Sequence, residues 1–119
     1  MGVIHVVGPG FRSGIWDNLS AMSALSAAYT QTFIEFAGSS KRVLRLLPIS
    51  GGIFVGQFHG VFPQMTLGGL VSGYSALNAE HRALISTTAT AELLHRPHAQ
   101  RMRAHFTPQH CLLCHLGLY

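Results

Sequence analysis

The residues best suited to chemistry in this sequence are the small side chains of Ser50, Gly51 and Gly52. Glycine adopts backbone angles that other residues avoid, and small side chains leave backbone N–H groups open to a ligand. Several N–H groups that converge in one loop make a concavity suited to an anion, above all a phosphate. Ile53 and Phe54 follow directly and place an apolar wall beside that cradle. The pattern predicts binding of a nucleotide-like ligand.

The spacing of these glycines matches neither of the two common phosphate-binding fingerprints. The sequence has no Gly-x-x-x-x-Gly-Lys-Ser/Thr, and Gly51, Gly52 and Gly56 do not fit Gly-x-Gly-x-x-Gly. A tight turn without a ligand is the alternative. His59 lies near the loop and is either a ligand contact or an exposed loop histidine without a role.

The loop follows an apolar run, Val43–Leu47, which is typical of a strand covered on both faces, as in a parallel sheet. Val3–Val7 is a second candidate strand, and His5 within it is expected to be a core or sheet histidine. A helix-length segment connects the two runs, and this arrangement predicts a βαβ unit with parallel strands. Because ligands of open α/β sheets bind beyond the carboxyl ends of strands, the loop lies where a site is expected.

Helical periodicity marks the connecting segment. Asp17 or Asn18 is expected to cap this helix, and Gly38 to end it. The apolar positions recur at spacings of three and four residues: Met22, Leu25, Tyr29, Phe33 and Phe36. This stripe indicates a core face rather than a ligand-binding surface.

A second helix is expected to open at Pro63. Its apolar positions are Leu67, Leu70, Val71, Tyr74 and Leu77. Glycines at 68, 69 and 73 lower its helix propensity but allow close packing on the sheet. Asn78 with Glu80 begins a short third helix, and Ala91–Leu94 is a candidate strand.

The composition limits the class of protein. The 119 residues suit one domain, and 48% hydrophobic with 10% charged residues excludes disorder throughout. A net charge of +4 and a pI near 9.7 favour an anionic partner, which is a nucleotide, a nucleic acid or a modified protein. No apolar run is long enough to span a bilayer and no secretory signal is evident, so we expect no membrane association and an intracellular, cytoplasmic or nuclear location.

The composition changes at about His95. We therefore divide the chain into residues 1–94 and a basic His/Arg-rich tail, 95–119, which has the composition of a disordered segment. Cys111-Leu112-Leu113-Cys114-His115 matches the c-type haem attachment pattern, although little chain remains to enclose a haem. A zinc site from these cysteines and two of His105, His110 and His115 is an alternative. Incidental cysteines are favoured, so no metal or cofactor is predicted.

Two motifs resemble the C-terminal portion of macro domains. Ile49-Ser50-Gly51-Gly52-Ile53-Phe54 is similar to the second phosphate-binding loop of that family, which usually reads Ser-Thr/Ser/Ala-Gly-Ile/Val-Phe/Tyr. Val3-Ile4-His5-Val6-Val7-Gly8-Pro9 is similar to the family's Val-Ile-His-x-Val-Gly-Pro strand, one helix earlier. The resemblance covers about residues 3–77 and extends at most to about residue 93, so residues 1–94 are expected to be a partial macro domain. It implies the α/β class, with a three-layer α/β/α fold truncated at its N-terminal side and a mostly parallel central sheet.

ADP-ribose, free or attached to a protein or nucleic acid, is the ligand that the resemblance implies. Ser50, Gly51, Gly52, Ile53 and Phe54 would hold the diphosphate and distal ribose, and Val55 and Gly56 would close the loop over the sugar. The alternatives are a hydrolase of ADP-ribosyl bonds and a truncated product that binds no ligand. The family's Asn-Ala-Ala-Asn strand, adenine-binding aspartate and first glycine loop have no counterpart here, so enzyme activity stays open.

Overall fold

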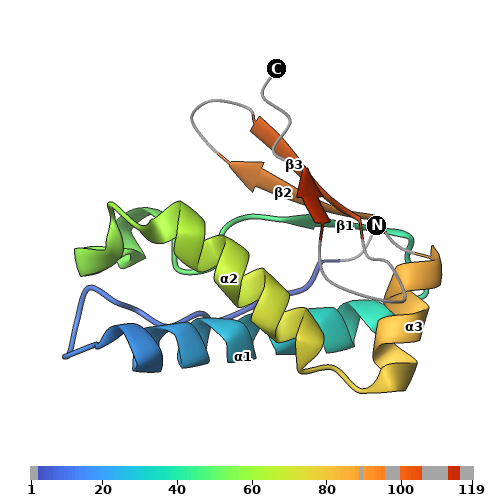
Figure 1. Cartoon of the computed structure of the whole chain (residues 1–119), viewed down its shortest axis with the longest axis horizontal. Helices are drawn as coiled ribbons and strands as arrows, with labels where there is room; N and C mark the ends of the chain where they lie inside the picture. The colour runs from blue at the N-terminus through green and yellow to red at the C-terminus, as the bar shows by residue number, and fades with distance from the viewer. Residues whose placement is uncertain (1–2, 89, 96–99, 106–112, 116–119) are drawn as a thin grey trace.

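The computed structural model of the chain describes residues 3–88, 90–95, 100–105 and 113–115. The helices are α1 (Asn18–Ala37), α2 (Phe62–Ser75) and α3 (Ala79–Thr88), and two short 3₁₀ turns cover Gly52–Phe54 and Gly56–Phe58. The strands are β1 (Val43–Leu46), β2 (Thr90–His95), β3 (Gln100–His105) and β4 (Leu113–His115). Figure 1 shows α1 and α2 packed against each other on one side of β1, while β2 and β3 extend away from α1.

The first expected helix is confirmed, with its cap and its core face. The Ser20 N–H donates to the Asp17 carboxylate at 2.6 Å, and Gly38 ends α1. Leu25, Tyr29 and Phe33 are fully buried. The apolar stripe of α1 therefore supplies the centre of the core.

The second helix packs on α1, whereas the sequence pattern predicted that it would pack on the sheet. A Cβ on Gly69 would lie 3.1 Å from Leu25 and Tyr29, and a Cβ on Gly73 would lie 2.8 Å from the Tyr29 Cβ. The Thr30 hydroxyl crosses the interface and donates to the Gly73 carbonyl at 3.0 Å. The glycines of α2 thus allow close approach of the two helices, because a side chain there would collide with α1.

Strand β1 is found within Val43–Leu47, but the expectation that both its faces are covered is wrong. Leu44 and Leu46 are buried, whereas Val43 and Leu47 are 51% and 66% exposed. The helices cover only the face that Leu44 and Leu46 occupy, so the burial alternates along the strand as in a sheet with one solvated face.

The predicted fold class is wrong: the chain is mostly helical, without a three-layer α/β/α arrangement around a parallel central sheet. The described strands follow the order β1-β2-β3-β4, and among them only β1 and β2 are parallel. The β2–β3 and β3–β4 pairs are antiparallel. Val3–Val7 is not a strand, because the described residues give it no ladder of hydrogen bonds. The βαβ unit proposed from the sequence is therefore also wrong.

The remaining expected elements are found where local signals placed them. Pro63 lies in the first turn of α2, and the Asn78 side chain accepts from the His81 N–H at 2.8 Å to cap α3. The strand expected at Ala91–Leu94 lies within β2, and β3 and β4 fall in the tail. The proposed haem and zinc sites include Cys111 and His110, which lie outside the described residues.

Candidate functional site

The main concave feature of the site is a groove beside β1. We call residues 3–10 the N-terminal segment; it forms one wall of the groove and β1 the other, with Thr32 and Phe36 of α1 at the floor. The volume of the groove is about 970 Å³, which lies within the range of ligand sites. The end of the groove beyond the last residue of β1 is lined by Ser50, Gly51 and Phe54, so the glycine loop borders this groove.

Ser50 is the most unusual residue of the loop. Its φ of 63° lies in the left-handed region, which costs a non-glycine residue about 1–2 kcal/mol. Its hydroxyl is buried and has no hydrogen-bond partner among the described residues, and the side chain is only 9% exposed. A buried hydroxyl without a partner carries a further cost of about 1–3 kcal/mol. The site thus combines backbone strain with an unused polar atom at the end of the groove.

Several backbone N–H groups of the loop are also unused. The Gly51 N–H donates to the Pro48 carbonyl at 3.2 Å, and the N–H groups of Phe54 and Val55 close the 3₁₀ turn. Within the described part of the chain, Ser50, Gly52 and Ile53 donate no backbone hydrogen bond. A Cβ on Gly52 would meet no atom within 4 Å, so main chain is open to a ligand at this position. Such donors in a turn are suited to an anion.

The loop is fixed at both ends by buried aromatic residues. The Tyr29 hydroxyl accepts a hydrogen bond from the Ile49 N–H at 3.1 Å, just before the loop. Burial raises the pKa of Tyr29 to about 12, so the ring stays neutral at physiological pH. After the loop, the Phe11 N–H donates to the Phe54 carbonyl at 3.0 Å. These contacts hold the unused donors in place without any ligand.

The structure places the seven predicted site residues in three environments. Ser50, Gly51 and Phe54 line the groove, and Phe54 is half exposed there. Gly52 and Ile53 lie on exposed surface next to it. Val55 is buried in the core, and Gly56 packs so closely on the Phe11 carbonyl that a Cβ would not fit.

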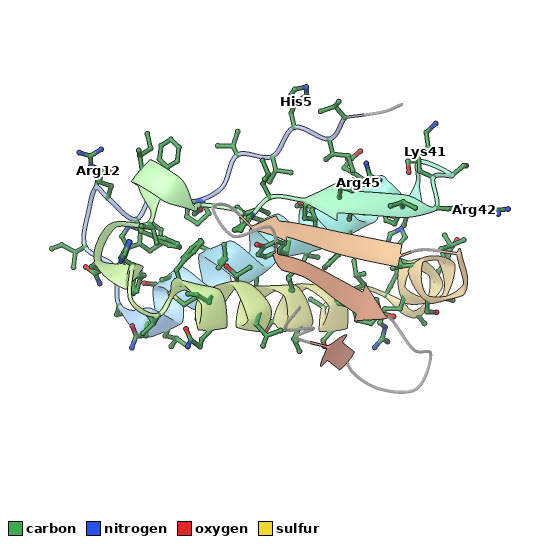
Figure 2. All side chains as sticks on the ribbon, turned by 90° about the horizontal axis from the view of Figure 1, so that it is seen from above. His5, Arg12, Lys41, Arg42 and Arg45 are labelled. Carbon is green, nitrogen blue, oxygen red and sulfur yellow. The ribbon has the colours of Figure 1, made fainter. Side chains whose placement is uncertain are left out.

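Of the histidines considered from the sequence, His5 and His59 lie away from the groove lining. His5 is exposed and points away from the body of the protein, so the expectation of a core or sheet histidine is wrong (Figure 2). Among the described residues, the segment around it has no sheet partner that would cover it. His59 is exposed and is not part of the groove lining.

The electrostatics of the groove favour an anion. Lys41 and Arg45 line it, and its described lining contains no Asp or Glu. Figure 2 shows Lys41, Arg42 and Arg45 together near the beginning of β1 and Arg12 at the opposite end of the molecule. Sequence reasoning missed the roles of Lys41 and Tyr29, because neither belongs to a local motif.

Comparisons with protein families, with curated proteins and with solved structures found no match to this chain. Among the described residues, no group of His, Cys, Asp and Glu side chains could hold a metal ion. No helix in that part of the chain combines the length and apolar character needed to cross a membrane. The geometry of the groove is therefore the basis for a functional proposal.

Proposed function

We propose that this chain binds ADP-ribose, free or attached to an intracellular protein or nucleic acid, through its diphosphate at Ser50–Phe54. The observation that carries the proposal is the buried, unpartnered Ser50 hydroxyl beside the unused N–H groups of Gly52 and Ile53. Diphosphate oxygens at this loop would accept hydrogen bonds from the exposed N–H groups of Gly52 and Ile53, and from the Ser50 hydroxyl once Gly8, which packs over it, moves aside.

The surroundings of the loop suit the rest of such a ligand. Phe54 offers a flat apolar face at the groove, and the N-terminal segment and β1 supply apolar walls. The positive charge of Lys41 and Arg45 adds a favourable field for a dianionic ligand. We propose binding rather than hydrolysis, because the described residues contain no counterpart of the catalytic loop that hydrolysis would need.

Calorimetric titration tests the proposal with ligands that differ in their phosphates. We expect ADP-ribose and ADP to bind, AMP to bind at least tenfold more weakly, and adenosine not to bind. Failure of ADP-ribose to bind, or equal affinity for adenosine, would contradict the proposal.

A pair of glycine variants locates the site. Gly52→Val is expected to weaken ADP-ribose binding at least tenfold, because its side chain would fill the open space above the main chain. Gly14→Val is the matched control, since Gly14 also has a positive φ, of 85°, but does not line the groove. Unchanged affinity in Gly52→Val, or equal loss in both variants, would remove this loop from the site.

A further inference from the structure

The edge of β1 that faces the groove has no strand partner within the described residues. β1 is the terminal strand of the sheet and pairs only with β2. An unpaired edge presents a row of backbone N–H and C=O groups to which another chain can add a strand. We propose that the groove receives an extended segment of a partner protein, which pairs with β1 and carries acidic side chains at alternate positions.

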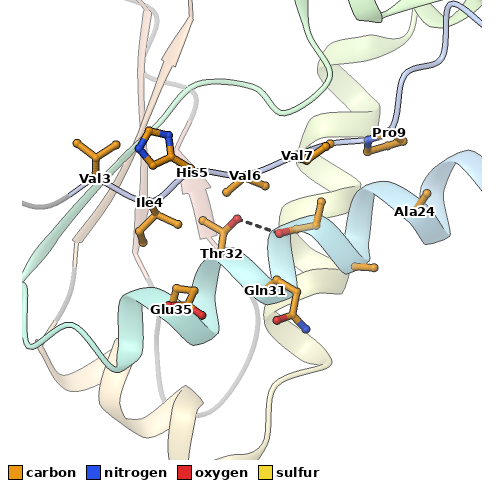
Figure 3. Close-up of a pocket in the computed structure, with 13 residues that line it drawn as sticks. Val3, Ile4, His5, Val6, Val7, Pro9, Ala24, Gln31, Thr32 and Glu35 are labelled. Atoms are coloured by element: carbon orange, nitrogen blue, oxygen red, sulfur yellow. Dashed lines mark hydrogen bonds between the residues drawn. The ribbon is translucent and has the colours of Figure 1, made fainter.

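The shape of the groove suits an extended chain. One wall is the strand β1, and the other is the N-terminal segment, which runs above α1 with Ile4 directed toward the helix and His5 away from it (Figure 3). A second hollow, of about 710 Å³, separates the same segment from the Ala24–Glu35 face of α1. The N-terminal segment is therefore bordered by a hollow on two sides, although Ile4 packs against the core and Gly8 packs closely on Ile49 and Ser50 at the end of the groove.

The side-chain pattern along β1 defines the chemistry of the incoming strand. Leu44 and Leu46 point into the core, whereas Val43 and Arg45 point to the solvated face. Side chains of an added strand alternate in the same way, so those above Phe36 need to be apolar. Those on the solvated face lie beside Arg45, which is in register with Glu92 of β2 on its other side, and near Lys41, where an opposite charge is favourable and a like charge is not.

Charge also selects a different protein over a second copy of this chain. Lys41 and Arg45 line the groove, and no Asp or Glu occurs in its described lining. A second copy would offer its own β1, which is flanked by the same cations, or its Val3–Val7 segment, which has no carboxylate. Neither complements the groove, and the net charge of +4 on each copy adds repulsion.

This inference does not depend on ADP-ribose binding. The added strand would lie along Val43–Leu46, whereas the diphosphate loop begins at Ser50, beyond the end of β1. Each strand residue advances about 3.3 Å, so Lys41 and Ser50 lie at different ends of the groove, although both ligands would contact its walls. The two ligands can be tested separately.

Fluorescence anisotropy with short labelled peptides and the full chain tests the inference. The probe is a peptide of about six residues, the usual length of a strand, with alternating Val and Glu. We expect saturable binding of this peptide, and at least tenfold weaker binding of a Val/Lys peptide and of a scrambled Val/Glu peptide. Methylation of its backbone nitrogens is expected to cost at least tenfold, because it removes the hydrogen bonds to the strand edge. Absence of binding, or equal binding of the methylated peptide, would overturn the proposal.

A charge reversal with a matched control places the peptide in the groove. Lys41→Glu is expected to weaken the Val/Glu peptide about three- to tenfold, and Arg12→Glu by less than twofold, since Arg12 lies away from the groove. Equal weakening by both variants would mean attraction to net charge alone and would overturn the proposal. Sedimentation of the free chain checks the other occupant: a dimer that the Val/Glu peptide dissociates would assign the groove to a second copy and contradict the inference.

Discussion

A Cβ on Gly73 would lie 2.8 Å from the Cβ of Tyr29, whereas a Cβ on Gly52 would meet no atom within 4 Å. In the α1–α2 interface, glycine lets two helices approach, and the Thr30–Gly73 hydrogen bond satisfies polar atoms at the contact. In the loop after β1, glycine leaves main chain uncovered, and the nearby Ser50 hydroxyl has no partner in the described residues. Glycine therefore allows close packing in the α1–α2 interface, which we call the closed region, and leaves main chain exposed in the loop after β1, which we call the open region.

The two regions are expected to serve different purposes: the closed region stabilises the fold, and the open region binds the ligand. The closed region buries the aromatic core around Tyr29 and Phe33, where tight packing contributes most of the favourable free energy. The open region retains the strained Ser50 and its unpartnered hydroxyl, which lower stability, and exposed N–H groups that are available to an anionic ligand. Changes in the closed region should therefore alter stability, and changes in the loop should alter affinity.

The largest expected effect is that of Gly73→Val. Its Cβ would lie 3.0 Å from the Ser26 carbonyl oxygen and 3.1 Å from the Thr30 nitrogen, so the backbone of α1 would have to move. We expect a loss of about 3 kcal/mol in the free energy of unfolding, measured by urea denaturation. The exposed Gly60→Val is the control and should change stability by less than about 0.5 kcal/mol, because a Cβ there meets nothing within 4 Å. Equal stability of the two variants would contradict close packing of α2 on α1.

Ser50→Gly should have the opposite effect on stability. It removes the left-handed strain and the unpartnered hydroxyl, partly offset by the greater entropy of glycine in the unfolded chain. We expect a gain of about 1–2 kcal/mol together with weaker ADP-ribose binding. Ser40→Gly is the matched control, since Ser40 has a φ of 60° but is exposed: it should gain only the part that comes from relief of strain, about 1 kcal/mol or less, and leave ADP-ribose binding unchanged. A destabilised Ser50→Gly protein would show that Ser50 has a structural role instead.

Tyr29 links the two regions, and its removal should have a smaller effect. Tyr29→Phe leaves the Ile49 N–H without its partner, at an expected cost of about 1 kcal/mol. Because burial raises the pKa of Tyr29 from 10.0 to about 12, its contribution is complete below pH 10 and is lost as pH rises toward 12. Unfolding curves at alkaline pH should therefore fall more steeply for the natural protein than for Tyr29→Phe. Parallel curves would place the Tyr29 hydroxyl in contact with solvent.

The smallest effect is expected at the exposed cap of α1. A hydrogen bond from the Ser20 N–H lowers the pKa of Asp17 below 3.8, so the contribution of this carboxylate is present above that pH and is lost as the pH falls through its lowered pKa. Melting temperatures of the natural protein and Asp17→Asn between pH 2 and 6 measure it. The difference between the two proteins should shrink on acidification, and a constant difference would argue against ionised Asp17 as the cap.

The helices could be predicted from the sequence because their signals are local. Asp17 and Asn78 cap the helices that they precede, and Pro63 lies in the first turn of α2. Strand pairing could not be predicted in this way, because it depends on a partner. Val3–Val7 has the composition of a strand but pairs with none in the described chain, and so His5 is exposed rather than buried.

The candidate site could be predicted only in part. The small side chains at Ser50–Gly52 indicated open main chain, and the loop does have unused donors. The support from Tyr29, which lies 20 residues before Ile49, and the groove beside β1 both result from tertiary packing. The spacing of residues along the sequence contains no information about such tertiary contacts. For the same reason, the sequence pattern predicted Val55 at the site, whereas the structure buries it in the core.

The most direct measurement is an amide NMR titration of the isotope-labelled chain with ADP-ribose. If bare main chain holds the diphosphate, the amide signals of Ser50, Gly52 and Ile53 should move most at saturation, and that of Gly60 should stay in place. Loop signals that remain unchanged while others shift, or an absence of any shift at saturating ligand, would contradict binding at this loop.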